Sequence, residues 1–181
     1  MIYELKKSHC AINMFIQLLS RKQTNIRLEY KNTSINRYCH KRTQIKMSYF
    51  NNRQIRFIAW VKNGKYHRIG APALISYIEN GQIQYKSWYK DGKFHRHGDA
   101  PAIIAFKNGQ IHEETWVKDG KTHRLGGPAD IKYFDNGQIH YKSWFANEKR
   151  HRIDAPAIVI YFENGTLKEE RWYKNGERFM V

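Results

Sequence analysis

Apolar and polar residues alternate along most of the chain after residue 60, with the two-residue period of an extended strand. In residues 82–90 (QIQYKSWYK), the odd positions carry Ile, Tyr, Ser and Tyr, and the even positions carry Gln, Gln, Lys, Trp and Lys. In the preceding segment Ala73, Ile75 and Tyr77 share a face, and equivalent residues repeat this at 129–133 and 157–161. This pattern predicts β-strands rather than helices.

Two sets of turn residues separate the predicted strands. Asn-Gly pairs stand at 80–81, 108–109, 136–137 and 164–165, and such a pair predicts a hairpin closed by a type I′ turn. A second set stands at 63–64, 91–92, 119–120, 147–148 and 175–176. Its fourth member is Asn-Glu, and Glu148 is strained where a turn needs positive φ. We therefore expect that hairpin to be looser than the others.

The whole pattern repeats with a period of 28 residues. Its defining residues are Trp60, Trp88, Trp116, Trp144 and Trp172; Pro72, Pro101, Pro128 and Pro156; and Gly81, Gly109, Gly137 and Gly165. Pro101 is displaced by one residue, because the segment HRHGDAP is one residue longer than HRIGAP, and PAIIAFKNG is one residue shorter than PALISYIENG, which predicts a shorter strand after Pro101. A strict period of this length is typical of a repeat array.

The predicted fold class is all-β. We expect an open, solenoid-like antiparallel meander of stacked β-hairpins over residues 60–181, with four full units and a terminal half unit. Residues 32–59 are interpreted as a degenerate capping repeat, in which Arg53 stands in place of the turn glycine. Residues 1–31 fit no unit and form a basic leader, predicted to be either a short helix around AINMFIQLLS or disordered.

The positive charge is concentrated at the N-terminal end. The chain has 32 Lys and Arg against 16 Asp and Glu, and residues 1–59 hold 12 of the basic and two of the acidic residues. Clustered basic residues bind phosphate without sequence preference, so residues 1–59 favour nonspecific nucleic-acid binding. The alternative is a solvated tail without a ligand.

Cysteine content and hydropathy point to a soluble intracellular protein. Cys10 and Cys39 are too few for a disulfide framework or a four-thiolate zinc site. The longest apolar run, residues 11–19, is shorter than the roughly 20 residues of a membrane span.

Four His-Arg pairs are the candidate chemistry: His67 and Arg68, His95 and Arg96, His123 and Arg124, and His151 and Arg152. Two strands per unit, about 4.8 Å apart, place equivalent histidines too far apart to share a metal ion. The glycines beside them are followed by Pro and a strand, whereas a phosphate loop leads into a helix. No catalytic, cofactor-binding or metal-binding residues are assigned, and we expect no enzymatic activity. The pairs either pack locally, with polar atoms on the backbone before Pro and the Arg stem on an aromatic ring, or form an exposed interaction ladder.

The tryptophans admit two interpretations. Placed beside lysines, as in KSWYK at 86–90, they could stack nucleic-acid bases. Locked to one position of each repeat, they are more typical of packing residues between hairpins.

The unit W…NG…HR…GPA…NG resembles MORN repeats (membrane occupation and recognition nexus) over about residues 60–178. It resembles more closely the repeat proteins of giant DNA viruses and large bacteriophages. This resemblance implies a β-hairpin repeat scaffold that mediates protein contacts, and a viral source with the virion or the host cytoplasm as its location. The primary hypothesis is a noncatalytic scaffold for an unknown protein partner. The alternative is a nucleic-acid-binding protein that uses the basic leader and the strands bearing Trp and Lys.

Overall fold

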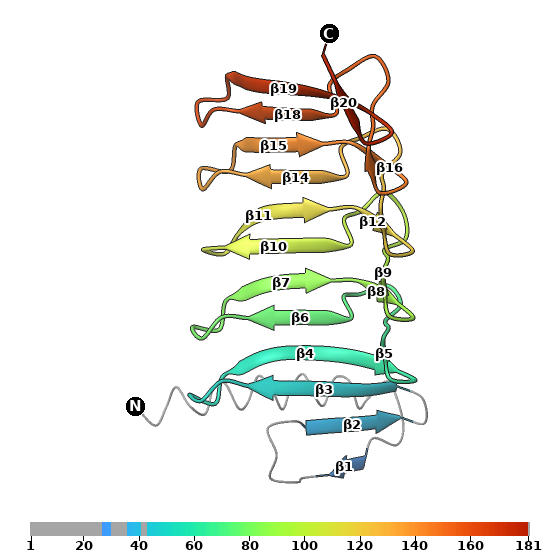
Figure 1. Cartoon of the computed structure of the whole chain (residues 1–181). Helices are drawn as coiled ribbons and strands as arrows, with labels where there is room; N and C mark the ends of the chain where they lie inside the picture. Colours follow the sequence, from blue (N-terminus) through green and yellow to red (C-terminus); the bar gives the residue numbers. More distant parts are fainter. Residues whose placement is uncertain (1–26, 30–35, 41–42, 181) are drawn as a thin grey trace.

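The structure is a computed structural model that describes residues 27–29, 36–40 and 43–180. These residues form antiparallel strands arranged as a stack of hairpins, and none of them is helical (Figure 1). One sheet runs through the stack in the order β1-β2-β3-β4-β6-β7-β10-β11-β14-β15-β18-β19-β20, and it is not closed into a barrel. The predicted open all-β meander is confirmed.

Each repeat contributes one long hairpin to this sheet. The hairpins are β3 (Thr43–Tyr49) with β4 (Ile55–Lys62), β6 (Leu74–Tyr77) with β7 (Ile83–Ser87), β10 (Ile103–Lys107) with β11 (Gln110–Thr115), β14 (Asp130–Tyr133) with β15 (Ile139–Ser143), and β18 (Ile158–Tyr161) with β19 (Leu167–Lys174). The second strand of each hairpin pairs with the first strand of the next, so every hairpin is held by its neighbours.

Before them, β1 (Arg27–Glu29) pairs with β2 (Asn36–His40), and β2 pairs with β3. Strand β1 therefore falls within the segment interpreted as the basic leader. The helix predicted around residues 11–20, and the alternative of disorder there, lie outside the described residues.

Short two-stranded ribbons connect the long hairpins. They are β5 (Lys65–Tyr66) with the end of β4, β8 (Tyr89–Lys90) with β9 (Lys93–Phe94), β12 (Val117–Lys118) with β13 (Lys121–Thr122), β16 (Phe145–Ala146) with β17 (Lys149–Arg150), and the end of β19 with β20 (Glu177–Phe179). They form a column along one side of the sheet, opposite the hairpin turns (Figure 1).

The long hairpins correct the prediction of type I′ turns. Only the Asn108-Gly109 pair has positive φ at both residues, at 52° and 79°. In the turn at Asn80, only the glycine is left-handed, and the Asn80 side chain accepts a hydrogen bond from the Gln82 N–H, at 2.9 Å. The same arrangement recurs at Asn136 and Asn164. The residue missing from the second repeat shortens this connection, because Phe106 pairs with Ile111 across four residues, whereas Tyr77 pairs with Ile83 across five.

The ribbon turns do have two left-handed residues each. Asn63, Asp91, Asp119, Asn147 and Asn175 have φ between 49° and 53°, and each is followed by a residue with positive φ. That residue is glycine except at Glu148, which has a φ of 67°. Arg53, in the first long hairpin, keeps the turn geometry with a φ of 66°. The backbone of Glu148 and that of Arg53 both have a positive φ, which glycine adopts more readily than a residue with a long side chain.

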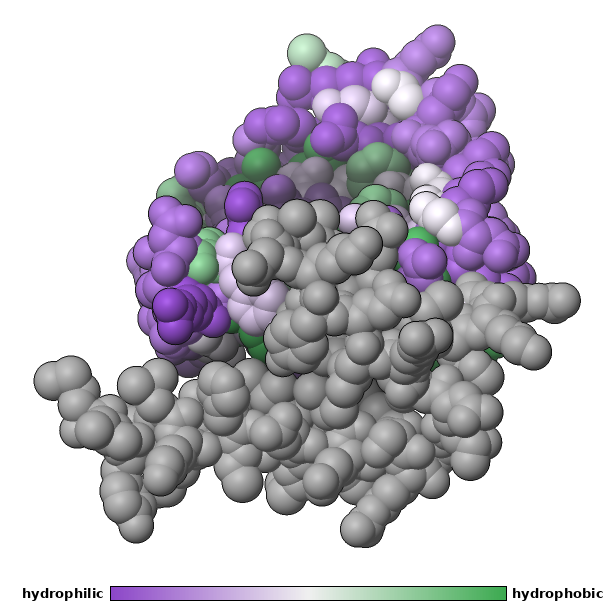
Figure 2. Space-filling view, turned by 90° about the horizontal axis from the view of Figure 1, so that it is seen from below, coloured by the Kyte–Doolittle hydropathy of each residue, from purple (hydrophilic) through white to green (hydrophobic). Residues whose placement is uncertain are grey.

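Strand register aligns side chains in rows across the sheet. Cross-strand pairing aligns Ile58 with Ile75, Lys86 and Ile104, and the row continues through Glu114 to Ile131. The tryptophans and the Pro-Ala alanines flank this row on the same face, and Trp116, Ala129 and Ile131 form one of the core clusters. Viewed along the stack, the molecule is hollowed, with apolar residues on the inner wall and hydrophilic residues outside (Figure 2).

Candidate interaction site at the repeat corners

Each repeat has a corner, where the chain leaves the sheet, makes a ribbon and returns. The corners span residues 60–73, 88–102, 116–129 and 144–157, and the corner loops within them span 67–72, 95–101, 123–128 and 151–156. In every corner the backbone N–H of Trp donates to the carbonyl of the alanine in Pro-Ala at 2.8 Å. The Trp carbonyl accepts from the backbone N–H of His at 3.0–3.1 Å. Those alanines, Ala73, Ala102, Ala129 and Ala157, have no solvent exposure, so a larger side chain would not fit.

The arginine of each pair lies over the tryptophan ring of its own corner. The Cζ atoms of Arg68, Arg96, Arg124 and Arg152 are 3.7–3.9 Å from the ring centroids of Trp60, Trp88, Trp116 and Trp144. Each arginine also donates from Nη1 to the carbonyl of the proline in its loop, at 2.9–3.3 Å. Cation–π contact and a backbone hydrogen bond therefore hold every guanidinium in one orientation.

The histidines connect consecutive repeats. His67 and His95 accept, at Nδ1, the backbone N–H of Asp91 and Asp119 in the next ribbon turn, both at 3.2 Å, and His151 accepts that of Asn175 at 3.1 Å. The aspartate side chains approach the same nitrogen, with Oδ1 at 2.9 Å. Each of these three histidines thus contacts a residue 24 positions further along the chain.

The third corner lacks this connection. Nδ1 of His123 is buried without a hydrogen-bond partner, and the turn it faces is Asn147-Glu148. The glycines of three sibling turns donate to the preceding ribbon, as Gly120 does to the Phe94 carbonyl at 2.9 Å. Among the described residues no such bond is formed by Glu148. Two ties between repeats are missing here, which agrees with the expected looser hairpin.

All eight residues of the His-Arg pairs are buried or half-buried, so they do not form a freely exposed ladder. Trp60, Trp88 and Trp116 are buried as well, and their rings are covered by arginine. In these corners the tryptophan is not open for stacking on a nucleic-acid base.

The residue after His-Arg is exposed in each loop, as is the residue that follows it, and sequence reasoning missed this position. Ile69, Leu125 and Ile153 are 82%, 83% and 71% exposed, and His97 takes this place in the second loop. We call Ile69, Leu125 and Ile153 the loop-tip residues. Large apolar side chains at three of four equivalent positions in polar loops were the signal available in the sequence.

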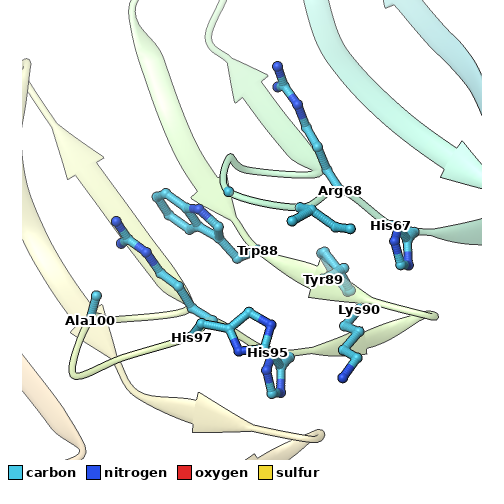
Figure 3. A pocket seen from close by; sticks show the side chains of 11 residues that line it. His67, Arg68, Trp88, Tyr89, Lys90, His95, His97 and Ala100 are labelled. Atoms are coloured by element: carbon cyan, nitrogen blue, oxygen red, sulfur yellow. The ribbon is translucent and has the colours of Figure 1, made fainter.

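Pockets lie between consecutive corners. One of about 350 Å³ lies between the first and second corner loops, with His67 and Arg68 from the first corner and Trp88, Tyr89, Lys90, His95 and His97 from the second (Figure 3). One of about 210 Å³ lies one repeat further on, lined by Arg96, Asp99, Trp116 and Arg124 among others.

In the smaller pocket, the guanidinium of Arg124 already binds a carboxylate of the chain itself. Arg124 donates from Nε to Oδ1 of Asp99 at 2.7 Å and from Nη2 to Oδ2 at 2.8 Å. These hydrogen bonds hold the pKa of Asp99 below its usual value. Asp99 is the residue inserted in the second loop, so the extra residue that displaces Pro101 supplies the partner of Arg124.

Next to the third corner, Asp130 at the start of β14 has a raised pKa. Burial, with Glu113 nearby, raises the pKa of Asp130 to about 6. Its Oδ1 is buried without a hydrogen-bond partner, as is Oγ of Ser143, the residue that pairs with it across β14 and β15. The equivalent positions in sibling repeats carry Leu74, Ile103 and Ile158.

Within residues 27–29, 36–40 and 43–180, His, Cys, Asp and Glu form no group of three that could hold a metal ion. The same residues contain no helix long and apolar enough to cross a membrane. No known family and no curated protein matches the chain.

Proposed function

We propose that the protein is a noncatalytic repeat scaffold that binds another protein through its corners, on the side of the sheet opposite the hairpin turns. The row of loop-tip residues carries this proposal. Ile69, Leu125 and Ile153 are exposed at the same position of three corners, although the loops around them are polar. Exposed apolar residues that recur along one side of a molecule are typical of protein interaction surfaces.

The arrangement behind the loop tips suits this role. The Trp-Arg-Pro contacts fix each loop, so a partner would meet a surface that is already ordered. The His contacts fix one corner relative to the next in three of the four repeats. A partner would therefore find the same feature at regular intervals, as on other repeat proteins.

The test replaces all three loop-tip residues with serine and compares the proteins recovered by proximity labelling in the native host. We expect the specific partner of the wild type to be lost. The control replaces Gln82, Gln110 and Gln138 with serine, because these exposed residues lie at the opposite, hairpin-turn end. Thermal unfolding checks that both variants fold. A partner retained by the loop-tip variant, or the absence of any specific partner, would refute the proposal.

The second candidate is nucleic-acid binding, favoured by a row of exposed lysines. Lys65, Lys93, Lys121 and Lys149 occupy one position of the ribbon turns. The stems of Lys65, Lys93 and Lys149 lie near the glycine of the next turn, as Lys65 does at Gly92, where a Cβ would be 3.4 Å away. Such a row could follow a phosphate backbone without sequence preference. This candidate requires binding to a single-stranded oligonucleotide that weakens steeply with salt; no binding at low salt would eliminate it.

A further inference from the structure

We infer that the pocket between the first and second corner loops binds a carboxylate side chain of an acidic peptide segment, through Nε and Nη2 of Arg96. This rests on the proposed function, because the peptide segment belongs to the protein partner. The reasoning starts from the third corner, where the chain provides its own example of the contact.

The pair of Arg124 and Asp99 shows how a corner arginine holds a carboxylate. Trp116 supports the guanidinium from one side, at 3.9 Å, and the Pro128 carbonyl accepts from Nη1, at 3.3 Å. Nε and Nη2 then remain as a parallel pair of donors, and both oxygens of Asp99 accept from them. Two parallel N–H···O bonds are the strong, geometrically selective mode of arginine–carboxylate recognition.

Arg96 has the same support and no carboxylate. Its Cζ is 3.8 Å from the Trp88 ring centroid, and its Nη1 donates to the Pro101 carbonyl at 2.9 Å. Neither Nε nor Nη2 has a hydrogen-bond partner among the residues that the structure describes. The reason is in the first loop: HRIGAP lacks the residue that places Asp99 in HRHGDAP. The pocket here is correspondingly larger, at about 350 Å³ against about 210 Å³.

The charges around this pocket favour an anion. Its basic lining residues are His67, Arg68, Lys90, His95, Arg96 and His97, and no aspartate or glutamate lines it. Neither Asp91 nor Glu114 lines the pocket; Oδ1 of Asp91 lies 2.9 Å from Nδ1 of His67, and Glu114 accepts from the Tyr133 hydroxyl at 2.7 Å. Burial lowers the pKa of Arg96, and Glu114 opposes this shift. Bringing a carboxylate to Nε and Nη2 would compensate for that desolvation.

Two features favour an acidic peptide over a nucleic acid. The occupant of the equivalent place is a carboxylate, Asp99. The rim of the pocket also carries the apolar Ile69, and Trp88 and Tyr89 form part of its wall. An acidic residue beside an apolar one fits this combination, whereas a phosphate backbone has no apolar neighbour to place on Ile69.

The experiment blocks the pocket with an aspartate, the residue that the second loop already uses for this contact. An aspartate inserted between Gly70 and Ala71 copies the second loop into the first and should place a carboxylate on Arg96. An inserted asparagine is the matched control, with the same loop length and no charge. The probe is a short fluorescein-labelled peptide that alternates aspartate with leucine, measured by fluorescence anisotropy at low salt with the full chain. A peptide that alternates asparagine with leucine is the uncharged probe.

We expect the inserted aspartate to weaken binding of the acidic peptide about tenfold or more, the effect of losing a charge-assisted bidentate pair. The inserted asparagine should weaken it far less, and the uncharged peptide should not bind. In the unaltered chain, the acidic peptide should shift the Nε–Hε NMR signal of Arg96 and leave that of Arg124 in place. With Asp99→Asn, the Arg124 signal should shift as well.

Equal affinity for the wild type and the aspartate insertion would overturn the inference. So would an Arg96 signal that responds to oligothymidylate and not to the acidic peptide, which would indicate a phosphate site. If the insertion variants do not fold, Arg96→Lys keeps the charge and removes the parallel donors, and unchanged peptide affinity in that variant would count against the inference. A host partner that is lost with the loop-tip residues but retained by the aspartate insertion would leave the scaffold function in place and remove only this pocket.

Discussion

Single residues in the corners have roles that follow from two contacts each. Tryptophan uses its backbone to join the sheet to the ribbon and its ring to support an arginine. Arginine uses one nitrogen for the proline carbonyl and keeps two for a carboxylate, as Arg124 does with Asp99. The residue between arginine and the loop glycine makes no such contact and remains exposed, which is why Ile69 and Leu125 carry the proposed function.

Replacing Trp116 with alanine should lower the free energy of unfolding by about 3–5 kcal/mol. The ring is buried between Arg124 and the Ala129–Ile131 cluster, so its loss leaves a cavity and an unsupported guanidinium. Urea unfolding followed by circular dichroism measures the change.

The matched control is Trp172→Ala. Trp172 is only half-buried, and the position that carries arginine in the other corners is the exposed Met180. We expect this substitution to cost clearly less. If both substitutions lowered the free energy of unfolding equally, the contribution of Trp116 to stability would not come from its arginine-covered corner.

At the level of elements, side chains at paired positions of neighbouring strands form rows across the sheet. Cross-strand pairing aligns Leu74, Ser87, Ile103, Thr115, Asp130, Ser143 and Ile158. Asp130 interrupts an otherwise apolar or hydroxyl-bearing row. Its raised pKa means that the folded chain binds a proton more tightly at this carboxyl than the unfolded chain does.

Asp130→Leu should stabilise the protein, and more at pH 7 than at pH 4. The pKa of Asp130 is about 6 in the folded chain and about 3.9 in an unfolded one, so the wild type loses stability as pH rises between these values. Because Asp130 is partly exposed, we expect this pH-dependent part to be about 1–2 kcal/mol.

Chemical unfolding of wild type and variant at several pH values measures the difference. Asp130→Asn is the control, since it removes the same titration without adding the apolar contact of leucine. Its advantage over the wild type should also grow between pH 4 and 6. A difference that stays constant with pH for both variants would contradict the assignment of the raised pKa.

For the whole molecule, the array has one structural unit and a corner that joins each unit to the next. Strand β7 pairs with β10 as β11 pairs with β14, so Ser87 and Thr115 stand in the same place relative to the following hairpin. The ties between corners are also shared, because Asp91 and Asp119 contact the preceding histidine in the same way. Stability in such an array is close to a sum over units and their interfaces.

Deleting residues 88–115 should therefore leave a folded, shorter array. The deletion removes one 28-residue period and joins Ser87 to Trp116, so every remaining strand keeps a partner. We expect a retained β-sheet circular dichroism spectrum and a cooperative thermal transition at a lower temperature. Removing only residues 102–115 takes out the β10–β11 hairpin together with Ala102, the acceptor of the Trp88 backbone N–H, so it leaves an incomplete corner joined directly to the next one and should prevent cooperative folding. Unfolding of the full-period deletion would contradict the unit assigned here.

The residues that define the period were sufficient to predict the strands, the hairpin positions and the open meander. Alternation, turn residues and a strict repeat are local properties, and each repeat forms the same local structure because it has the same sequence. Local packing of Arg68 and its equivalents on aromatic rings and on the backbone before Pro was also among the interpretations that the sequence offered. The turn type at Asn80 was wrong, because one more residue in the connection leaves only Gly81 left-handed.

Only the tertiary structure decided which residues of one repeat meet the next. The contact of His67 with Asp91, and that of Asp99 with Arg124, depend on how consecutive corners lie side by side. A one-residue insertion in a loop changes such a contact without changing the period, so sequence spacing alone does not reveal it. The amino-acid sequence by itself determined a repeated β-hairpin unit, whereas the stacking of those units determined that Arg124 is occupied, that Arg96 is open, and that the loop tips remain exposed.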